Sequence, residues 1–215
     1  MTANNCIVHV IDDDNSWRTS VQRLMSAIGY RVTLYESAEA FLKTAILSLP
    51  GCVLLDVRMP GLSGPQLQQR LVDMGATLPI IFISGHGDIP TSVRAMKSGA
   101  EDFLTKPVPT EALVAAVAQA IARDGKDRVI REQLDVMHSR VDTLTPTERK
   151  VLALVVRGML NKNIAGELGT AERTVKWHRH NIMEKLQVQS LAELVSMVER
   201  LGAVGVKVNT NHKSR

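Results

Sequence analysis

The residues of this chain best suited to chemistry stand where short apolar runs end. Asp12 and Asp13 follow one run, Asp56 ends a second, and Lys106 ends a third. A short apolar run bounded by polar residues is typical of a buried strand in a parallel sheet, and the ends of such strands meet at one edge. We therefore expect these carboxylates and this ammonium to converge. Such a set suits a hard divalent cation and a phosphoryl group.

Asp56 is the candidate nucleophile of this set, because a carboxylate can attack phosphorus and form an acyl phosphate. A bound Mg²⁺ would offset the charge of the attacking and leaving oxygens, and Lys106 would bind a phosphoryl oxygen as a point charge. Ser84 ends a fourth run and offers a hydroxyl donor. The plainer interpretation is a surface acidic turn, with Asp14 or Asn15 as a helix cap, and a surface lysine. Asp56 and Lys106 at the ends of two other expected strands make that interpretation the less favoured one.

Strand-like and helix-like segments alternate along the first part of the chain. This alternation predicts a doubly wound, five-stranded parallel sheet with helices on both faces, an α/β fold. Gly29, Gly75 and Gly99 stand where three of the helices should end. The expected strands cover residues 7–12, 31–35, 52–56, 80–84 and 102–105.

The last third of the chain has helical spacing and helix-start signals. Thr145 and Glu148 form a capping box around a proline, which predicts a helix start. Further starts are expected at Asn161, Thr170 and Ser190, with Asn161 and Thr170 as caps. Two short helices followed by a basic helix are typical of a helix-turn-helix. This part is therefore predicted to be a small all-α, four-helix domain.

The predicted third helix, residues 171–186, has two unlike sides. On a period of 3.6 residues, Arg173, Lys176, Trp177 and His180 lie opposite the apolar side. A helix fits the major groove of DNA, where lysine and arginine reach guanine acceptors. Three further cations are candidates for phosphate contacts that position the helix, namely Lys162, Arg179 and Lys185. The alternative is an ordinary solvated basic helix.

Charge is unevenly spread along the chain. Residues 1–123 hold 10 Lys and Arg against 11 Asp and Glu, a net of −1, and residues 124–215 hold 16 against 11, a net of +5. A basic part suggests nucleic acid as a partner. We divide the chain into a sheet domain at 5–123, a helical linker at 124–141, a helical domain at 142–205 and a flexible tail at 206–215. Gly125 marks a break or hinge in the linker, and dimerisation through the linker stays open.

Several protein classes are disfavoured by composition. No apolar run approaches the ~20 residues of a membrane helix, and the N-terminus lacks the features of a signal peptide, so we expect a cytoplasmic protein without membrane partners. Cys6 and Cys52 are expected to be buried free thiols, and no ligand cluster accompanies them to suggest zinc.

Residues 5–123 resemble the flavodoxin-like receiver domain of bacterial two-component response regulators. The acidic pair, the Asp in LLDVRMPGLSG, the Ser in FISGHGD and the Lys in DFLTKP carry this resemblance. It implies that Asp56 accepts phosphate from a sensor histidine kinase. It also implies that Ser84 and Lys106 grip the phosphoryl group and that Phe103 is the aromatic switch residue. An ordinary core role for Phe103 is equally open.

The same resemblance implies a set of Mg²⁺ ligands. Asp13 and Asp56 would bind the ion directly, Asp12 mostly through water, and Arg58 through its backbone carbonyl. These assignments rest on the resemblance and not on spacing.

Residues 142–205 resemble the LuxR-type DNA-binding domain of the NarL/FixJ family, through the segment LTPTERKVLALVVRGMLNKNIAGELGTAERTVKWHRHNIMEKLQVQSLAELV. The resemblance implies that Lys176, Trp177 and His180 face the bases. We expect Thr174 to contact the DNA as well. The two halves together are similar to the FixJ-type regulators and to regulators of styrene or toluene breakdown.

The function predicted is that of a DNA-binding transcription regulator and not of an enzyme. Phosphorylation of Asp56 would relieve inhibition by the receiver and promote a homodimer on a double-stranded DNA operator, with RNA polymerase as a candidate partner. One alternative is a phosphorylation-independent DNA-binding regulator with a degenerate receiver. A phosphotransfer enzyme is disfavoured because there is no Gly-rich phosphate loop, and an RNA binder because aromatic stacking residues are few.

Overall fold

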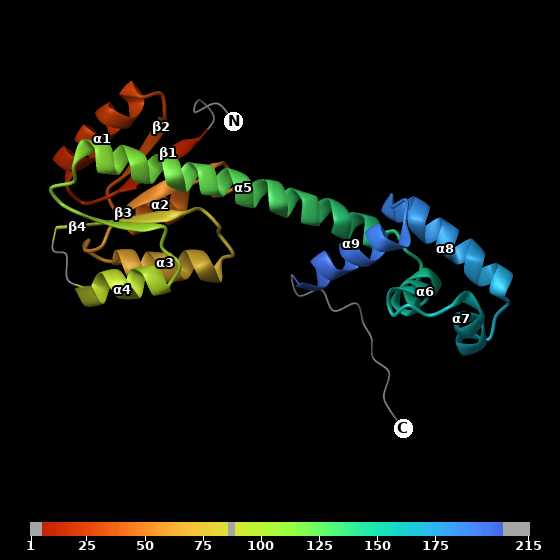
Figure 1. Cartoon of the computed structure of the whole chain (residues 1–215). Coiled ribbons are helices and arrows are strands. Elements are labelled where there is room, and N and C mark those ends of the chain that lie inside the picture. Colours follow the sequence, from red (N-terminus) through yellow and green to blue (C-terminus); the bar gives the residue numbers. More distant parts are fainter. Residues whose placement is uncertain (1–5, 86–88, 204–215) are drawn as a thin grey trace. The chain divides into compact units, whose positions relative to one another are not determined.

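The computed structural model describes residues 6–85 and 89–203 (Figure 1). The chain divides into two compact units, Met1–Arg128 and Val129–Arg215. The predicted tail at 206–215 lies outside the described residues. Within the described ranges, no helix has the length and apolar character needed to cross a membrane.

The first unit is built on a parallel sheet of five strands in the order β2-β1-β3-β4-β5. The predicted sheet is confirmed, and three strands match their expected residues. The first strand ends one residue earlier than predicted, and the third begins one residue earlier. The strands are β1 (Ile7–Ile11), β2 (Arg31–Tyr35), β3 (Gly51–Asp56), β4 (Ile80–Ser84) and β5 (Asp102–Thr105).

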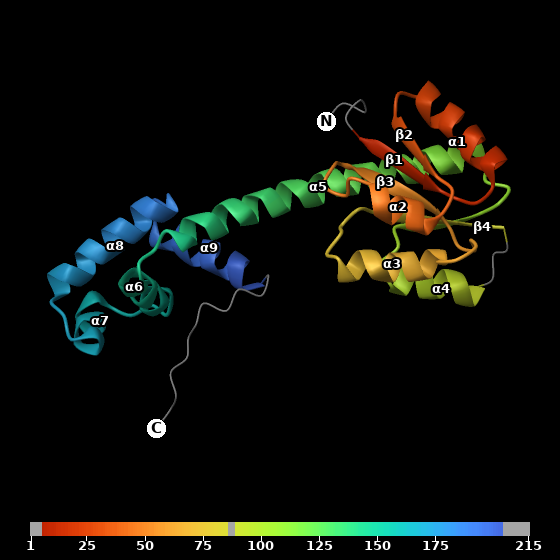
Figure 2. The ribbon, with the colours of Figure 1, turned by 180° about the vertical axis from the view of Figure 1, so that it is seen from behind.

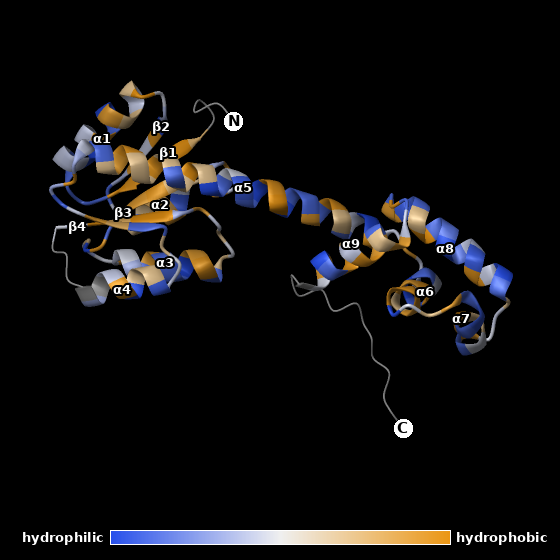
Figure 3. Ribbon diagram, viewed as in Figure 1, coloured by the Kyte–Doolittle hydropathy of each residue, from blue (hydrophilic) through white to orange (hydrophobic). Residues whose placement is uncertain are grey.

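Helices cover both faces of this sheet (Figures 1 and 2). α1 (Asn15–Ala27) and the first half of α5 (Thr110–Asp142) pack on one apolar cluster, which includes Leu54. α2 (Ala38–Thr44), α3 (Gly64–Asp73) and α4 (Ile89–Lys97) pack on the other, which includes Leu55. Because successive side chains of a strand face opposite ways, a central strand must be apolar throughout to fill both clusters. Figure 3 shows this concentration of apolar residues in the strands.

Helix α5 runs without interruption through Gly125, so no break occurs there. Arg128 explains part of this continuity: its guanidinium binds the buried carboxylate of Asp124 at 2.7 Å, one helical turn away. The same guanidinium donates to the carbonyl oxygens of Ser48 and Leu49 at 2.6 and 2.7 Å. These contacts hold the helix on the turn that follows Gly125 and oppose the cost of about 1 kcal/mol that a glycine imposes within a helix.

The second unit is all-helical. α6 (Pro146–Val156), α7 (Asn161–Leu168), α8 (Glu172–Leu186) and α9 (Leu191–Ala203) enclose one apolar cluster, and the last turns of α5 pack against the same cluster. The predicted capping box of Thr145 and Glu148 is confirmed.

Two predicted helix caps in this unit are wrong. Leu160 and Ala171 occupy the cap positions of α7 and α8, and neither cap makes a side-chain hydrogen bond. Asn161 is instead the first residue of α7, where its side-chain oxygen accepts a hydrogen bond from Arg179 at 2.8 Å. The side chain of Asn161 is therefore engaged by a residue 18 positions further along the chain, which local sequence does not reveal.

Candidate functional site

The carboxyl edge of the sheet brings the predicted acidic and basic residues together. Asp12 follows β1, Asp56 ends β3, Ser84 ends β4, and Lys106 follows β5. The register places Asp56 opposite Ile83, so that Asp56 and Ser84 lie at the same edge on neighbouring strands. The parallel topology is therefore what assembles residues far apart in sequence into one pocket.

The ammonium of Lys106 lies between the two buried carboxylates. Its Nζ is 2.6 Å from Oδ2 of Asp12 and 3.1 Å from Oδ1 of Asp56. Asp12 is 0 % exposed and Asp56 is 6 % exposed. The backbone N–H of Lys106 donates to the carbonyl of Ser84 at 2.7 Å, and the Lys106–Pro107 peptide bond is cis. The lysine thus offsets part of the charge of two carboxylates that are removed from water, and the three groups together keep a negative charge that suits a cation.

Burial and charge act in opposite directions on the pocket's ionisable groups. Burial raises the pKa of Asp56 above its ordinary value, and although Lys106 lowers it, the net shift is upward. Burial lowers the pKa of Lys106, but its hydrogen bonds to Asp12 and Asp56 outweigh this effect and raise it overall. The lysine therefore stays an ammonium at neutral pH.

The loop that carries Asp12 is held by its own side chains. Oδ1 of Asp12 accepts the N–H of Asp14 at 2.8 Å, and Asp14 caps α1 by accepting the N–H groups of Ser16 and Trp17. Arg18 donates to the backbone carbonyl of Asp12 at 2.5 Å. Because Arg18 is buried and fixed, it holds the acidic loop in position.

The donor set of this pocket fits Mg²⁺. Asp12 and Asp56 share one ammonium, so their carboxylates lie close together, and Mg²⁺ is usually bound by one or two carboxylates with the remaining positions filled by water or substrate oxygens. Asp13 is exposed beside them, and Arg58 lies next to the pocket, its N–H donating to Oδ2 of Asp56 at 2.7 Å. Among the described residues, no group of three or more His, Cys, Asp or Glu side chains is arranged as a metal cluster.

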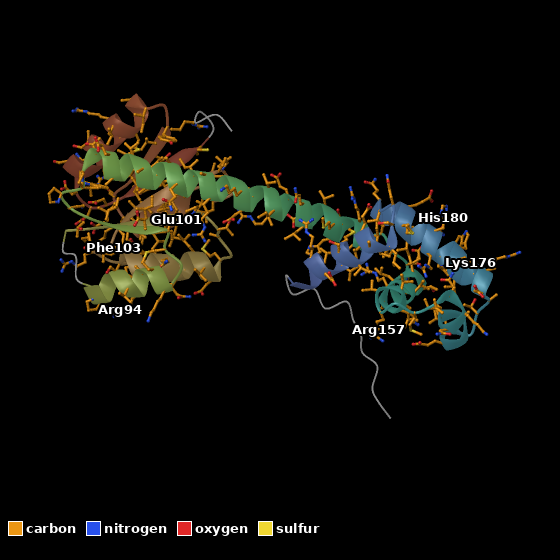
Figure 4. All side chains as sticks on the ribbon, in the orientation of Figure 1. Arg94, Glu101, Phe103, Arg157, Lys176 and His180 are labelled. Atoms are coloured by element: carbon orange, nitrogen blue, oxygen red, sulfur yellow. The ribbon has the colours of Figure 1, made fainter. Side chains whose placement is uncertain are left out.

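In the second unit, α8 has the two sides expected from its sequence. Val175, Ile182 and Leu186 are buried in the apolar cluster. Trp177 is 59 % exposed on the other side. Lys176 and His180 point away from the helix (Figure 4) and pair loosely with glutamates one turn away, at 3.6 and 3.8 Å. Arg173 and Thr174 are exposed on the first turns of the helix. An exposed tryptophan between cations is suited to contact with DNA.

Comparison with known families assigns each unit separately. Residues 8–118 match the response regulator receiver domain, and residues 142–198 match the bacterial regulatory proteins of the luxR family. This chain is a two-component response regulator of the LuxR type. It is therefore a DNA-binding transcription regulator and not an enzyme.

Whole-chain similarities agree with this assignment. Nodulation protein W of Bradyrhizobium diazoefficiens is 43% identical over 210 residues, which cover 98% of this chain and 90% of that protein. The structure of the response regulator StyR matches with a TM-score of 0.81 at 46% identity, covering 91% of this chain and 99% of StyR. Full-length FixJ from B. japonicum matches with a TM-score of 0.57 at 40% identity, covering 93% and 98%.

Phe103 of this response regulator belongs to the sheet's packing. It is half-buried against the apolar cluster that includes Phe82, and the two ring centroids are 6.4 Å apart. The structure thus shows Phe103 packed at the edge of the core, and the choice between a packing role and a switch role stays a prediction.

The three proposed phosphate contacts of the response regulator differ in their surroundings. Lys162 is exposed. Arg179 donates to Asn161, as described above. Lys185 binds Oε2 of the buried Glu148 at 2.7 Å, so it completes the capping box at the start of α6. Lys185 therefore has a structural partner that its sequence position did not reveal, and its contact with phosphate stays a prediction.

Sequence reasoning missed several residues that shape the receiver pocket. Arg18 and Trp17 follow the acidic loop but carry no strand-end signal. Gly64, at the start of α3, lies against β3: a Cβ atom there would come within 2.4 Å of the carbonyl oxygen of Asp56. The only available signal for Gly64 was its place in the motif LLDVRMPGLSG.

Proposed function

We propose that Asp56 is the phosphoacceptor of this response regulator and that a sensor histidine kinase is the donor. The observation that carries the proposal is the single ammonium of Lys106 held by both Asp12 and Asp56. An oxygen of Asp56 attacks phosphorus, the bond from phosphorus to the donor nitrogen breaks, and the nitrogen keeps the electron pair. Lys106 and Ser84 then bind the phosphoryl oxygens.

Mg²⁺ is the cofactor that we propose for this transfer. The carboxylates of Asp12, Asp13 and Asp56 and the backbone carbonyl of Arg58 would hold it. When bound, it would neutralise charge on the transferred group. Support comes from the pocket, which offers two buried carboxylates and one exposed carboxylate on adjoining strand ends.

The output that we propose is binding to a double-stranded DNA operator through α8. Lys176, Trp177 and His180 would meet base edges, with Arg173 and Thr174 beside them. Lys162 and Arg179 would contact phosphates. The exposure of Trp177 between cations supports this assignment.

Phosphorylation would shift an equilibrium that already exists between inactive and active forms. In the active form the receiver no longer restrains the DNA-binding unit, and a homodimer binds paired half-sites. Contact with RNA polymerase would follow on DNA, in the cytoplasm.

The test is phosphorylation by phosphoramidate in the presence of Mg²⁺. The P–N bond of phosphoramidate breaks as the P–O bond to Asp56 forms, and the nitrogen leaves as ammonia. Intact mass should show one added phosphate in the wild type and in Asp73→Asn, a matched exposed acid on α3, but none in Asp56→Asn. Sedimentation should show dimers in the phosphorylated samples.

Absence of phosphate in the wild type, or phosphate that persists in Asp56→Asn, would contradict the assignment of the phosphoacceptor. Phosphate at Asp56 without a change in sedimentation would contradict the dimerisation step and favour a regulator whose DNA binding is independent of phosphorylation.

A further inference from the structure

The ammonium of Lys106 has a third neighbour besides the two carboxylates. Its Nζ lies over the indole ring of Trp17, 4.7 Å from the ring centroid. A cation at this distance from an aromatic face is attracted by the ring quadrupole, most strongly for tryptophan. One side of the ammonium therefore faces an aromatic surface while two carboxylates face its other sides.

Trp17 is held firmly enough to act as such a surface. Its backbone N–H donates to the capping carboxylate of Asp14 at 3.3 Å. The next residue, Arg18, donates to the carbonyl of Asp12 at 2.5 Å. The indole also packs at the edge of the apolar cluster shared by α1 and α5. One turn of the chain therefore holds the backbone of both Trp17 and Asp12, and packing at the edge of the cluster restricts the indole.

We propose that Trp17 is a positioning residue for Lys106. A lysine side chain is a point charge on a flexible stem of four carbons, so its ammonium takes a defined place only where its surroundings restrict it. The indole would restrict it on the side that the carboxylates leave open. The ammonium is then already directed at Asp56 before the phosphoryl group arrives, and a preorganised charge needs little rearrangement during the transfer. This inference rests on the proposed phosphorylation of Asp56.

The first test is geometric and needs no metal. Because Nζ of Lys106 lies over the indole, the NMR signals of the protons on the adjoining ε-carbon should be shifted upfield by the ring current in the metal-free protein. The shift should disappear in Trp17→Leu and persist, reduced, in Trp17→Phe. It should be unchanged in Leu24→Ala, which removes apolar packing from the same helix and the same cluster. A wild-type signal at the ordinary position of a lysine would overturn the proposal.

The second test is the rate of phosphorylation by phosphoramidate at fixed Mg²⁺, followed by intact mass. Loss of a partly buried cation–π contact should slow Trp17→Leu by about 3- to 10-fold. Trp17→Phe and Leu24→Ala should stay within about twofold of the wild type, because the first keeps an aromatic face and the second does not touch Lys106. Equal slowing in Leu24→Ala would show that lost packing is the cause and would overturn the proposal.

The outcomes separate this inference from the function on which it rests. If the wild type takes up phosphate and Trp17→Leu reacts at the same rate, the positioning role is wrong and the phosphoacceptor assignment stands. If the wild type takes up none, the proposed function fails first, and the positioning role fails with it.

Discussion

At the scale of single residues, the buried ionisable groups of the receiver differ in whether they have a partner of opposite charge. Asp12 and Asp56 are buried beside the partly exposed ammonium of Lys106, and this set is suited to binding a cation and a phosphoryl group. His9 is buried on β1, where its Nδ1 lies 3.1 Å from the hydroxyl of Tyr35 and its Nε2 has no partner among the described residues. Within the part of the chain that the structure describes, no carboxylate is paired with His9, so its burial lowers stability in acid and it does not belong to the site.

The pH dependence of stability should reveal this histidine. Burial lowers the pKa of His9 from 6.5 to about 4, so between these values the unfolded chain binds a proton that the folded protein excludes. The free energy of unfolding is therefore unaffected by His9 protonation above pH 6.5. It decreases as the pH falls from 6.5 toward 4. Urea unfolding at pH 7 and pH 4.5 should show roughly 2–3 kcal/mol more loss in the wild type than in His9→Leu. An equal loss in both proteins would refute the assignment, whatever their absolute stabilities.

At the scale of elements, sequence patterns were sufficient where a local rule decides the structure. Apolar runs located the strands, and Gly29 shows the positive φ of 93° expected at the end of a helix. Pairings that join distant segments were not visible. Arg179 with Asn161 and Lys185 with Glu148 connect α8 to other helices, and nothing in the spacing of α8 distinguishes a lysine that meets a glutamate from one that meets a phosphate.

Two lysines of the DNA-binding unit should therefore behave differently when neutralised. Lys185→Met removes a hydrogen-bonded partner from the buried Glu148 and should cost about 1–3 kcal/mol of stability. Lys162→Met, at an exposed lysine, should leave stability within about 0.5 kcal/mol but weaken DNA binding and reduce its dependence on salt. Thermal unfolding and salt titrations of DNA binding measure both effects. Lys185→Met with unchanged stability and weakened DNA binding would favour its role as a phosphate contact.

At the scale of the whole molecule, the two units carry separate chemistry that phosphorylation must connect. The receiver holds the acidic pocket, the second unit holds the basic helix, and α5 contributes residues to both units. Such a connection is a coupling free energy between two sites, typically 1–3 kcal/mol. It is measured as the ratio of DNA affinities with and without phosphate.

Mutations in the two units should act on this ratio in different ways. Phosphorylated wild type should bind its operator about 5- to 150-fold more tightly than the unmodified protein at one salt concentration. Lys176→Ala removes a base contact worth about 1–3 kcal/mol in both forms, so each affinity should fall while their ratio is preserved. Asp56→Asn should bind DNA with the affinity of the unmodified wild type, and treatment with phosphoramidate should not change that affinity, so the ratio should be about one. A ratio that also collapses in Lys176→Ala would mean that phosphorylation changes how α8 meets the bases, and not only how often the binding form is populated.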